Sequence, residues 1–423
     1  MGSQKEISLP RQFTNVNKAV SYASAGSREP GVHQRISMRD GLSPFGPPKG
    51  FDELETQIRA SNEARLAQRS YYEADITPAE EGVLKRFGCD DRSRVLFNTN
   101  YGSDGLIRNL LIALRSGTRI AGVGPHWPGI VQNIDGMDEL SYGPISPPLN
   151  LSADERLLWT VENHKRTPGR NKLGVIYNSS PTFRGDLPGR DVRLEAIRHF
   201  TDKGVLWIED EDMADFYPDH ESVADETQDN PYLVVARSAS KAIGLPGLGF
   251  GYMILNENTA RILEQTMSDH SLRGVDRLLI NALFGDSREF IDPHLEEVVR
   301  PQTRDRKITL RNELTSWEID TLPTDNQTPV MFVDGKVEGI ALEASKMDLV
   351  VAPGSGFDRT YDPNLSTRYA RAVILRSRSQ IKTSAERLAY AIRVAQEKKT
   401  PSRDTHIPVV LFYDVAEPTD GFY

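Results

Sequence analysis

The chain has 423 residues, enough for about two to four domains of roughly 100 to 200 residues each. Its 51 lysines and arginines against 60 aspartates and glutamates give a net charge of −9, which argues against a nucleic-acid-binding surface because such a surface needs a concentrated basic face. The single cysteine cannot form an internal disulfide, and the longest apolar runs are far shorter than the ~18 residues of a membrane-spanning helix. We therefore expect a soluble, cytoplasmic protein without a membrane or nucleic-acid partner.

Short strands and helices alternate through the first two thirds of the chain. The first fifty residues are polar and rich in glycine and proline at 41–50, which predicts an irregular arm, and helical periodicity begins near Glu53. Apolar runs predict strands at 94–97, 119–123, 173–177, 205–210, 233–237 and 250–255, and the helices between them include 104–115 and 194–203. This alternation predicts an α/β fold with a largely parallel, covered sheet, in which functional loops follow the carboxyl ends of the strands.

A smaller α+β domain is predicted after Pro293. A charged helix over 295–317 acts as a connector, strands are expected at 329–333, 349–352 and 370–375, and a closing helix at 384–398. The tail carries an apolar run at 409–413 that reads as an added edge strand or a packing arm. We therefore expect an arm and part of the small domain at 1–70, the large domain at 71–293, the small domain at 294–400 and a tail at 401–423.

The strongest local motif is a Ser-Ala-Ser-Lys sequence that begins at Ser238 and leads into a turn with four glycines before Tyr252. Glycines allow the backbone to turn tightly and to approach a ligand closely. Lys241, held in a partly dry site, can lose its proton and form a Schiff base with a carbonyl group. An isolated Ser-x-Ser-Lys is also typical of an exposed loop, so this interpretation depends on the other motifs.

An acidic run, residues 209–212, ends the strand predicted at 205–210. A carboxylate at a strand end, such as Asp210, can hold a proton on a pyridine nitrogen and make the ring a better electron sink. The alternatives are a solvated acidic edge and a magnesium site, because magnesium prefers clustered hard oxygen ligands.

Two further turns follow predicted strands. Gly102, Ser103 and Asp104 lie at the start of a predicted helix, where free backbone amides and the helix dipole favour an anion such as phosphate, although Ser103 also suits an ordinary helix cap. Trp127, in a Pro-His-Trp-Pro sequence, can stack on a flat cofactor, although a single tryptophan commonly packs in a core.

In this order the motifs resemble those of pyridoxal-phosphate enzymes of fold type I, the class I and II aminotransferase family, and most closely its histidinol-phosphate aminotransferase branch. The resemblance extends from about Leu42 to Ala395 and includes a Gly-Ser-Asp turn, an aromatic residue beside proline, an Asn/Pro/Thr turn, a strand-end Asp-Glu and Ser-x-Ser-Lys. It implies an aspartate-aminotransferase-like fold, namely a three-layer αβα large domain with a mainly parallel sheet plus a small α+β domain. It also implies pyridoxal 5′-phosphate as cofactor, an amino-acid substrate and a homodimer.

The resemblance also implies roles for individual residues. Lys241 forms the Schiff base with the cofactor and moves protons, Asp210 pairs with the pyridine nitrogen, and Trp127 stacks on the ring. The remaining cofactor-binding positions surround the phosphate or the phenolic oxygen, and they are Gly102, Ser103, Asp104, Ser238, Ser240, Asn178 and Ser180. Tyr72 matches a tyrosine that such dimers lend across the subunit boundary to the other phosphate site.

An arginine near residue 376 matches the family's ligand for the substrate carboxylate. A planar guanidinium suits bidentate binding of a carboxylate. The spacing to Thr383 and Glu386 favours Arg378, whereas the local sequence pattern favours Arg376, so both are candidates.

Several positions depart from the family pattern. Ser180 stands where an asparagine normally binds the cofactor's phenolic oxygen, with Asn178 as a possible substitute, and the family's Asp-Glu-Ala-Tyr segment ends here in Met213, which has no hydroxyl. Gly249 replaces an arginine that contacts the phosphate, and Arg237 and Arg184 are candidates to restore that contact. The family's amino-terminal pocket asparagine is also missing, because the corresponding segment, 41–47, contains none.

Losing two donors to the phenolic oxygen should raise the pKa of the Schiff base unless other groups compensate. We therefore expect a specialised amino-acid-transforming enzyme. Transamination is the leading hypothesis, and elimination or decarboxylation- or oxidation-coupled deamination are alternatives that start from the same chemistry. A regulatory relative without catalysis is a third hypothesis, but its usual helix-turn-helix domain has no counterpart in the first fifty residues.

Overall fold

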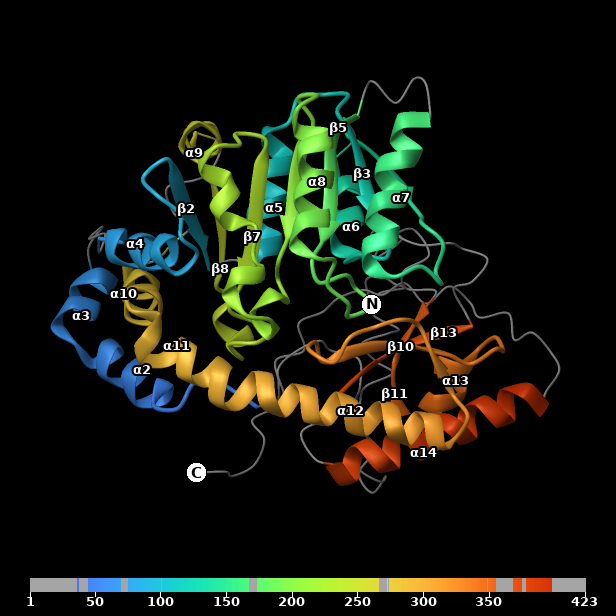
Figure 1. Cartoon of the computed structure of the whole chain (residues 1–423). Coiled ribbons are helices and arrows are strands. Elements are labelled where there is room, and N and C mark those ends of the chain that lie inside the picture. Colours follow the sequence, from blue (N-terminus) through green and yellow to red (C-terminus); the bar gives the residue numbers. More distant parts are fainter. Residues whose placement is uncertain are drawn as a thin grey trace, which may run out of the picture.

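The computed structural model describes residues 36–37, 45–69, 75–99, 101–137, 139–166, 173–265, 272, 274–347, 349–354, 368–374 and 378–397. Within these residues the largest sheet has seven strands, which in spatial order are β2 (Ser93–Asn98), β8 (Gly251–Asn256), β7 (Leu233–Ser238), β6 (Leu206–Asp210), β5 (Leu173–Ser179), β3 (Arg119–Val123) and β4 (Ser141–Ile145) (Figure 1). Neighbours from β7 to β4 are parallel, whereas β8 runs antiparallel to both β7 and β2. The sheet is therefore mainly parallel, as predicted.

Helices cover both faces of this sheet (Figure 1). One face packs against α5 (Gly102–Ala113) and α6 (Gly129–Asp135), and the other against α7 (Ala153–Arg166), α8 (Arg190–Thr201) and α10 (Gly274–Phe284). Along β5, Val175 and Tyr177 enter the first core and Ile176 enters the second, because successive side chains of a strand point to opposite faces. This arrangement confirms the predicted three-layer αβα fold.

The other elements of the large sheet region lie at its edges. Near β2 are α4 (Thr77–Arg86) and α9 (Glu257–Glu264), and α2 (Phe51–Ala60) and α3 (Asn62–Arg69) pack against α10. Four 3₁₀ turns, η2 (Ala214–Phe216), η3 (Asp219–Glu221), η4 (Ala224–Gln228) and η5 (Pro246–Leu248), complete the described part of this region.

A smaller antiparallel sheet follows in the order β12 (Ala352–Pro353), β13 (Tyr369–Val373), β10 (Val330–Asp334) and β9 (Asp320–Thr321). It packs with α13 (Ile340–Ser345), α12 (Arg300–Ser316) and α14 (Arg378–Glu397), and the last two lie side by side (Figure 1). A parallel pair joins β1 (Ile36–Ser37) to β11 (Leu349–Val350). The predicted small α+β domain is thus confirmed in its architecture.

A long helical segment connects the two sheets. Helix α11 (Ser287–Pro293) continues through a π-helical turn (His294–Val299) into α12, so the domain boundary predicted at residue 293 falls inside it. The boundaries at 70, 293 and 400 remain predictions, and the tail at 401–423 lies outside the described residues. No helix in the described ranges is long and apolar enough to cross a bilayer.

Lys307 of α12 ties the two sheet regions together. Its fully buried ammonium nitrogen Nζ donates to Gly185 O (3.2 Å) in the loop after β5, and to Thr324 Oγ1 (2.8 Å) and Thr328 Oγ1 (3.0 Å) before β10. Burial lowers the pKa of Lys307 to about 7, although the negative charge of Asp325 acts to raise it.

Candidate active site

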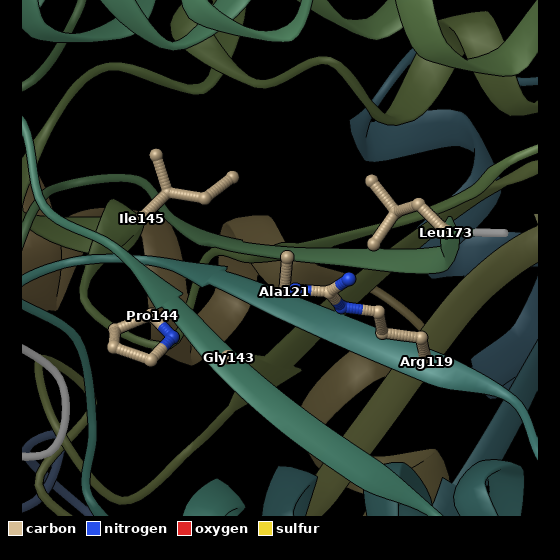
Figure 2. A pocket seen from close by; sticks show the side chains of 6 residues that line it. All are labelled: Arg119, Ala121, Gly143, Pro144, Ile145 and Leu173. Atoms are coloured by element: carbon tan, nitrogen blue, oxygen red, sulfur yellow. The ribbon is translucent and has the colours of Figure 1, made fainter. Parts of the chain in front are cut away.

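The first candidate to consider is a small pocket between β3, β4 and β5 (Figure 2). It encloses about 20 Å³ and is lined by Arg119, Ala121, Gly143, Pro144, Ile145 and Leu173. A volume of this size holds about one water molecule, so the pocket is too small for a substrate.

Polar residues from separate segments meet at the carboxyl edge of the large sheet. Lys241 lies in the turn after β7, and its Nζ is 3.6 Å from Asp212 Oδ2 and 5.6 Å from the centroid of the Trp127 ring. Trp127 Nε1 in turn donates to Asp104 Oδ2 (3.0 Å) at the start of α5. Because parallel strands end at the same edge, their loops converge here, and we call these four residues the lysine cluster.

The start of α5 forms a cradle beside the lysine cluster. Gly102 adopts a left-handed backbone (φ +57°), and its N–H donates to Gly249 O (2.9 Å). A Cβ added to Gly251 would lie 2.1 Å from the Gly102 carbonyl carbon, so only glycine lets β8 approach α5 this closely. A Cβ on Gly102 would be 3.5 Å from Ser238 Oγ, which accepts the Ser240 N–H (2.9 Å).

This cradle fits an anionic group. It combines the amino-terminal end of a twelve-residue helix with the hydroxyls of Ser103, Ser238 and Ser240, all of them buried. Such an end attracts phosphate because its backbone N–H groups point outward along the helix dipole. The predicted phosphate residues are thus brought together, although the Ser103 hydroxyl donates to Asp212 Oδ1 (3.0 Å).

Asp210 ends β6 and is buried. Its Oδ2 accepts a hydrogen bond from the Tyr177 hydroxyl and its Oδ1 accepts the Asp212 N–H (3.1 Å). Burial, with the nearby charges of Asp212 and Asp104, raises the pKa of Asp210 to about 8, and the Tyr177 hydrogen bond opposes this rise. A protonated pyridine nitrogen placed here would stabilise the ionised carboxylate, so the site suits the group predicted for it.

Asp104 has a similarly perturbed carboxyl group. Loss of surrounding water and the charge of Asp212 raise its pKa to about 7, whereas Lys241 and the Trp127 N–H act in the opposite direction. Carboxyl groups with such values near a lysine are typical of sites that move protons.

Asn178 and Ser180 bond to each other. Asn178 Nδ2 donates to Ser180 Oγ (3.1 Å) and to Glu209 Oε2 (2.9 Å), so both of its N–H donors are directed into the protein. Met213, at the family's tyrosine position, is buried. These contacts give Asn178 no spare donor with which to replace the missing asparagine and tyrosine.

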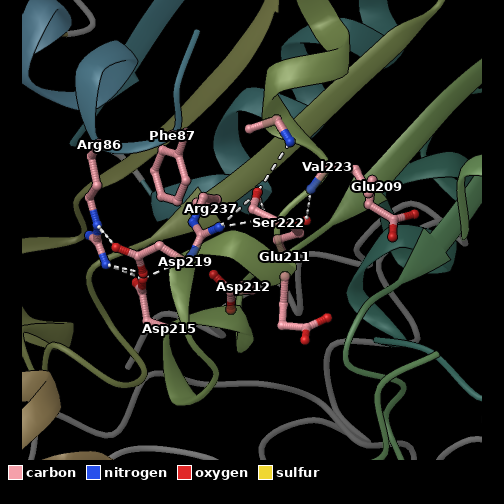
Figure 3. A network of polar contacts seen from close by, with 12 residues as sticks. Arg86, Phe87, Glu209, Glu211, Asp212, Asp215, Asp219, Ser222, Val223 and Arg237 are labelled. Carbon is pink, nitrogen blue, oxygen red and sulfur yellow. Dashed lines mark hydrogen bonds and ion pairs between the residues drawn. The ribbon is translucent and has the colours of Figure 1, made fainter. Parts of the chain in front are cut away.

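Neither arginine proposed for the phosphate is directed to the cradle. Arg237 donates to Glu211 Oε2 (2.5 Å) and Asp215 Oδ1 (2.7 Å) in a buried network (Figure 3). Arg184 donates to Asp186 and to the carbonyl oxygens of Leu149 and Leu151. Gly249 itself has a left-handed backbone (φ +60°), in which a larger side chain would be strained.

The buried network fixes the segment that carries Asp210 and Asp212. Glu211 lies between them and also accepts from Ser222 Oγ (2.6 Å) and Val223 N (3.1 Å). Arg86 extends the network to Asp215 and Asp219, both at 2.9 Å (Figure 3). Ion pairs and hydrogen bonds on both sides of Glu211 therefore anchor this loop to its neighbours.

The structure distinguishes among the arginines that could bind a substrate carboxylate. Arg378 starts α14, its side chain is 61% exposed, and it pairs with Asp305 (2.6 Å), so the structure does not bring it to the lysine cluster. Arg376 and Tyr72 lie outside the described residues. By contrast Arg371 of β13 is 4% exposed, and its Cζ lies 4.2 Å from the centroid of the Phe183 ring.

Phe183 links Arg371 to the lysine cluster, because its ring centroid is 5.7 Å from that of Trp127. The sequence does contain a signal for Arg371. It is a charged residue in the middle of an apolar strand, a place where arginine is rare unless it has a partner or a function. In the described part of the chain, no group of three or more His, Cys, Asp or Glu side chains could hold a metal ion.

Comparisons with known proteins agree with this geometry. The family model for aminotransferases of class I and II matches residues 79–352. Histidinol-phosphate aminotransferase of Clostridium novyi (strain NT) is 22% identical over 237 residues, a match that covers 55% of this chain and 62% of that relative's length.

Solved structures show the same fold at low sequence identity. A multiple substrate aminotransferase from Thermococcus profundus has a TM-score of 0.72 and 14% identity, with 94% of this chain and 98% of that chain covered. Histidinol-phosphate aminotransferase from Sinorhizobium meliloti in complex with pyridoxal-5′-phosphate has a TM-score of 0.68 and 16% identity, with 92% and 100% covered.

Proposed function

The chain belongs to the aminotransferase class I and II family, and on that premise we propose that it transfers the amino group of an amino acid particular to a specialised pathway. It is a pyridoxal-phosphate-dependent enzyme of this family, and the observation that carries the proposal is the lysine cluster. Lys241 lies beside the Trp127 ring at the carboxyl edge of the sheet, next to a cradle suited to phosphate. This is where a parallel α/β sheet binds its ligands.

The residues present fit pyridoxal 5′-phosphate, which supplies an electron sink when it is bound. Lys241 would hold it covalently and move the proton at the substrate carbon. Trp127 offers a flat face, Asp210 an acceptor for the pyridine N–H, and Ser103 and Ser238 hydroxyls for the phosphate. Tyr177 and the Asp212 N–H hold the Asp210 carboxylate in place for this contact.

We assign the substrate carboxylate to Arg371 in preference to Arg376 or Arg378. Its buried guanidinium packs on Phe183, which contacts Trp127, so a carboxylate bound there would lie beside the lysine cluster. A planar guanidinium binds a carboxylate through two parallel hydrogen bonds and thereby orients the substrate. The homodimer, the role of Tyr72 across its boundary and the cytoplasmic location remain predictions from the sequence.

A second candidate function is a lyase or a deaminase on the same scaffold. The observation that favours it is the loss of donors on the side expected for the phenolic oxygen. Met213 has no hydroxyl and Ser180 accepts the Asn178 N–H, so the electronic setting of the cofactor would differ from that of an ordinary aminotransferase.

The products of the reaction separate the two candidates. The purified enzyme is incubated with a panel of amino acids, with and without a keto-acid acceptor, and the products are identified by mass spectrometry. Amino-group transfer predicts a new amino acid formed from the acceptor and no turnover without it. Ammonia or a cleaved side chain without acceptor would instead support the lyase or deaminase, and Lys241→Ala should abolish either outcome.

A further inference from the structure

Asp212 is a carboxylate at a position where the family's Asp-Glu-Ala-Tyr segment has alanine. Its two oxygens make different contacts. Oδ2 lies 3.6 Å from Lys241 Nζ and Oδ1 accepts the Ser103 hydroxyl at 3.0 Å. The side chains of Asp212 and Lys241 are only 21% and 23% exposed, so a charge at Asp212 acts on the lysine through a partly dry environment.

The position of Asp212 is fixed by its surroundings. The Ser103 hydroxyl orients the carboxylate from one side, and the Asp212 N–H is bonded to Asp210. The preceding residue, Glu211, is clamped by Arg237 and Ser222. The carboxylate therefore faces Lys241 because the loop holds it there.

We propose that Asp212 is a positioning residue that holds the Lys241 nitrogen beside the Trp127 ring and stabilises the cationic form of the link between that nitrogen and the cofactor. The proposal deepens the proposed function and rests on it, because the nitrogen concerned is the one that would link the enzyme to its cofactor. An anion beside this nitrogen stabilises its cationic form and so favours the electrophilic state that an incoming amine attacks.

Asp104 of α5 also interacts electrostatically with Lys241, and Asp210 of β6 lies near both Asp104 and Asp212. The negative charge of Asp212 contributes to raising the pKa of both, to about 7 and about 8, after the larger effect of burial. Both can thus hold a proton near neutral pH, and Asp212 is the carboxylate in direct ion-pair contact with the lysine.

The test is a pH titration of the visible absorbance of the full-length enzyme loaded with pyridoxal 5′-phosphate. Asp212→Asn keeps an acceptor for Ser103 but removes the charge, and Asp212→Ala restores the residue of the family. Asp212→Glu retains the charge. Asp229→Asn is the matched control, because Asp229 is a 66% exposed carboxylate that pairs with Arg92.

A unit charge at 3.6 Å shifts the midpoint of such a titration by at least about 0.8 of a pH unit, even in a water-like dielectric. We expect the midpoints of Asp212→Asn and Asp212→Ala to fall by this amount or more, and those of Asp212→Glu and Asp229→Asn to match the wild type. If the two neutral variants fold, bind the cofactor and titrate like the wild type, the proposal is overturned. If the wild type itself takes up no cofactor after borohydride reduction and mass analysis, the proposed function fails instead.

Discussion

The hydrogen bond from Tyr177 to Asp210 gives a sharp prediction for the variant Tyr177→Phe. Tyr177 is fully buried on β5, and phenylalanine would keep its ring in the edge contact with His126, whose centroid is 4.9 Å away. The substitution therefore removes one donor to the Asp210 carboxylate and little else. A hydrogen bond to a charged acceptor contributes about 1.5–3 kcal/mol, which corresponds to roughly one to two pKa units.

The direction follows from the same contact. Because the Tyr177 hydroxyl stabilises the ionised carboxylate, its loss should raise the already elevated pKa of Asp210 further. The ionised form that holds the pyridine N–H would then appear only at higher pH. We expect the acid limb of the kcat/KM profile to move upward by roughly one to two pH units, together with weaker cofactor binding.

The assay is kcat/KM measured from about pH 6 to 10 for the wild type, Tyr177→Phe and a control, Tyr142→Phe. Tyr142 carries a similar hydroxyl that contacts His126 Nε2, so the control removes a phenol from the same region without touching Asp210. An acid limb of Tyr177→Phe that coincides with those of the wild type and the control would refute the reasoning.

Three further predictions follow from other contacts. Arg371→Lys should raise KM for the amino acid at least tenfold, because a lysine cannot bind a carboxylate through two parallel hydrogen bonds. Arg378→Lys should leave KM unchanged. Equal effects of the two substitutions would contradict the assignment of the substrate carboxylate to Arg371. Burial lowers the pKa of Lys307 from 10.5 to about 7, so between these two pH values the unfolded chain binds one more proton than the folded chain. The melting temperature should therefore rise as the pH increases from 7 to 10.5. A Lys307→Met variant that shows the same rise would contradict the attribution of this rise to Lys307. Burial acts to raise the pKa of Asp219, but pairing with Arg86 outweighs it and lowers this pKa from 3.8 to about 2. The shift corresponds to a stabilisation of about 2 kcal/mol. This stabilisation is present above pH 3.8 and is lost as the pH falls through 2. Asp219→Asn should therefore melt earlier than the wild type at neutral pH, and the difference should shrink in acid.

Most of the large sheet could be predicted because its inner strands are continuous apolar runs buried on both faces. The predicted strand at 119–123 coincides with β3, and those at 205–210 and 233–237 differ from β6 and β7 by one residue. Strand β4 was not predicted because Gly143 and Pro144 interrupt its pattern. It lies at the edge of the sheet, where proline is tolerated because its missing N–H can face away from the adjacent strand.

The site could be predicted only in part. Lys241 and Trp127 follow strands and Asp210 ends one, and these positions alone place them at one edge of the sheet. The roles of Tyr177 and Asp212 depend on tertiary contacts, since the pairing of β5 with β6 sets which side chain faces Asp210. Arg371 was not among the predicted candidates because the short apolar residues around it match a core strand, and the predicted arginines, Arg376 and Arg378, follow that strand.

The most direct test of the central claim is the site of covalent cofactor attachment. The purified full-length chain is loaded with pyridoxal 5′-phosphate, reduced with borohydride, digested and mapped by mass spectrometry. The account predicts one reduced pyridoxyl phosphate group on Lys241 and none in Lys241→Ala. Attachment to a different lysine, or no attachment in a folded protein, would contradict it.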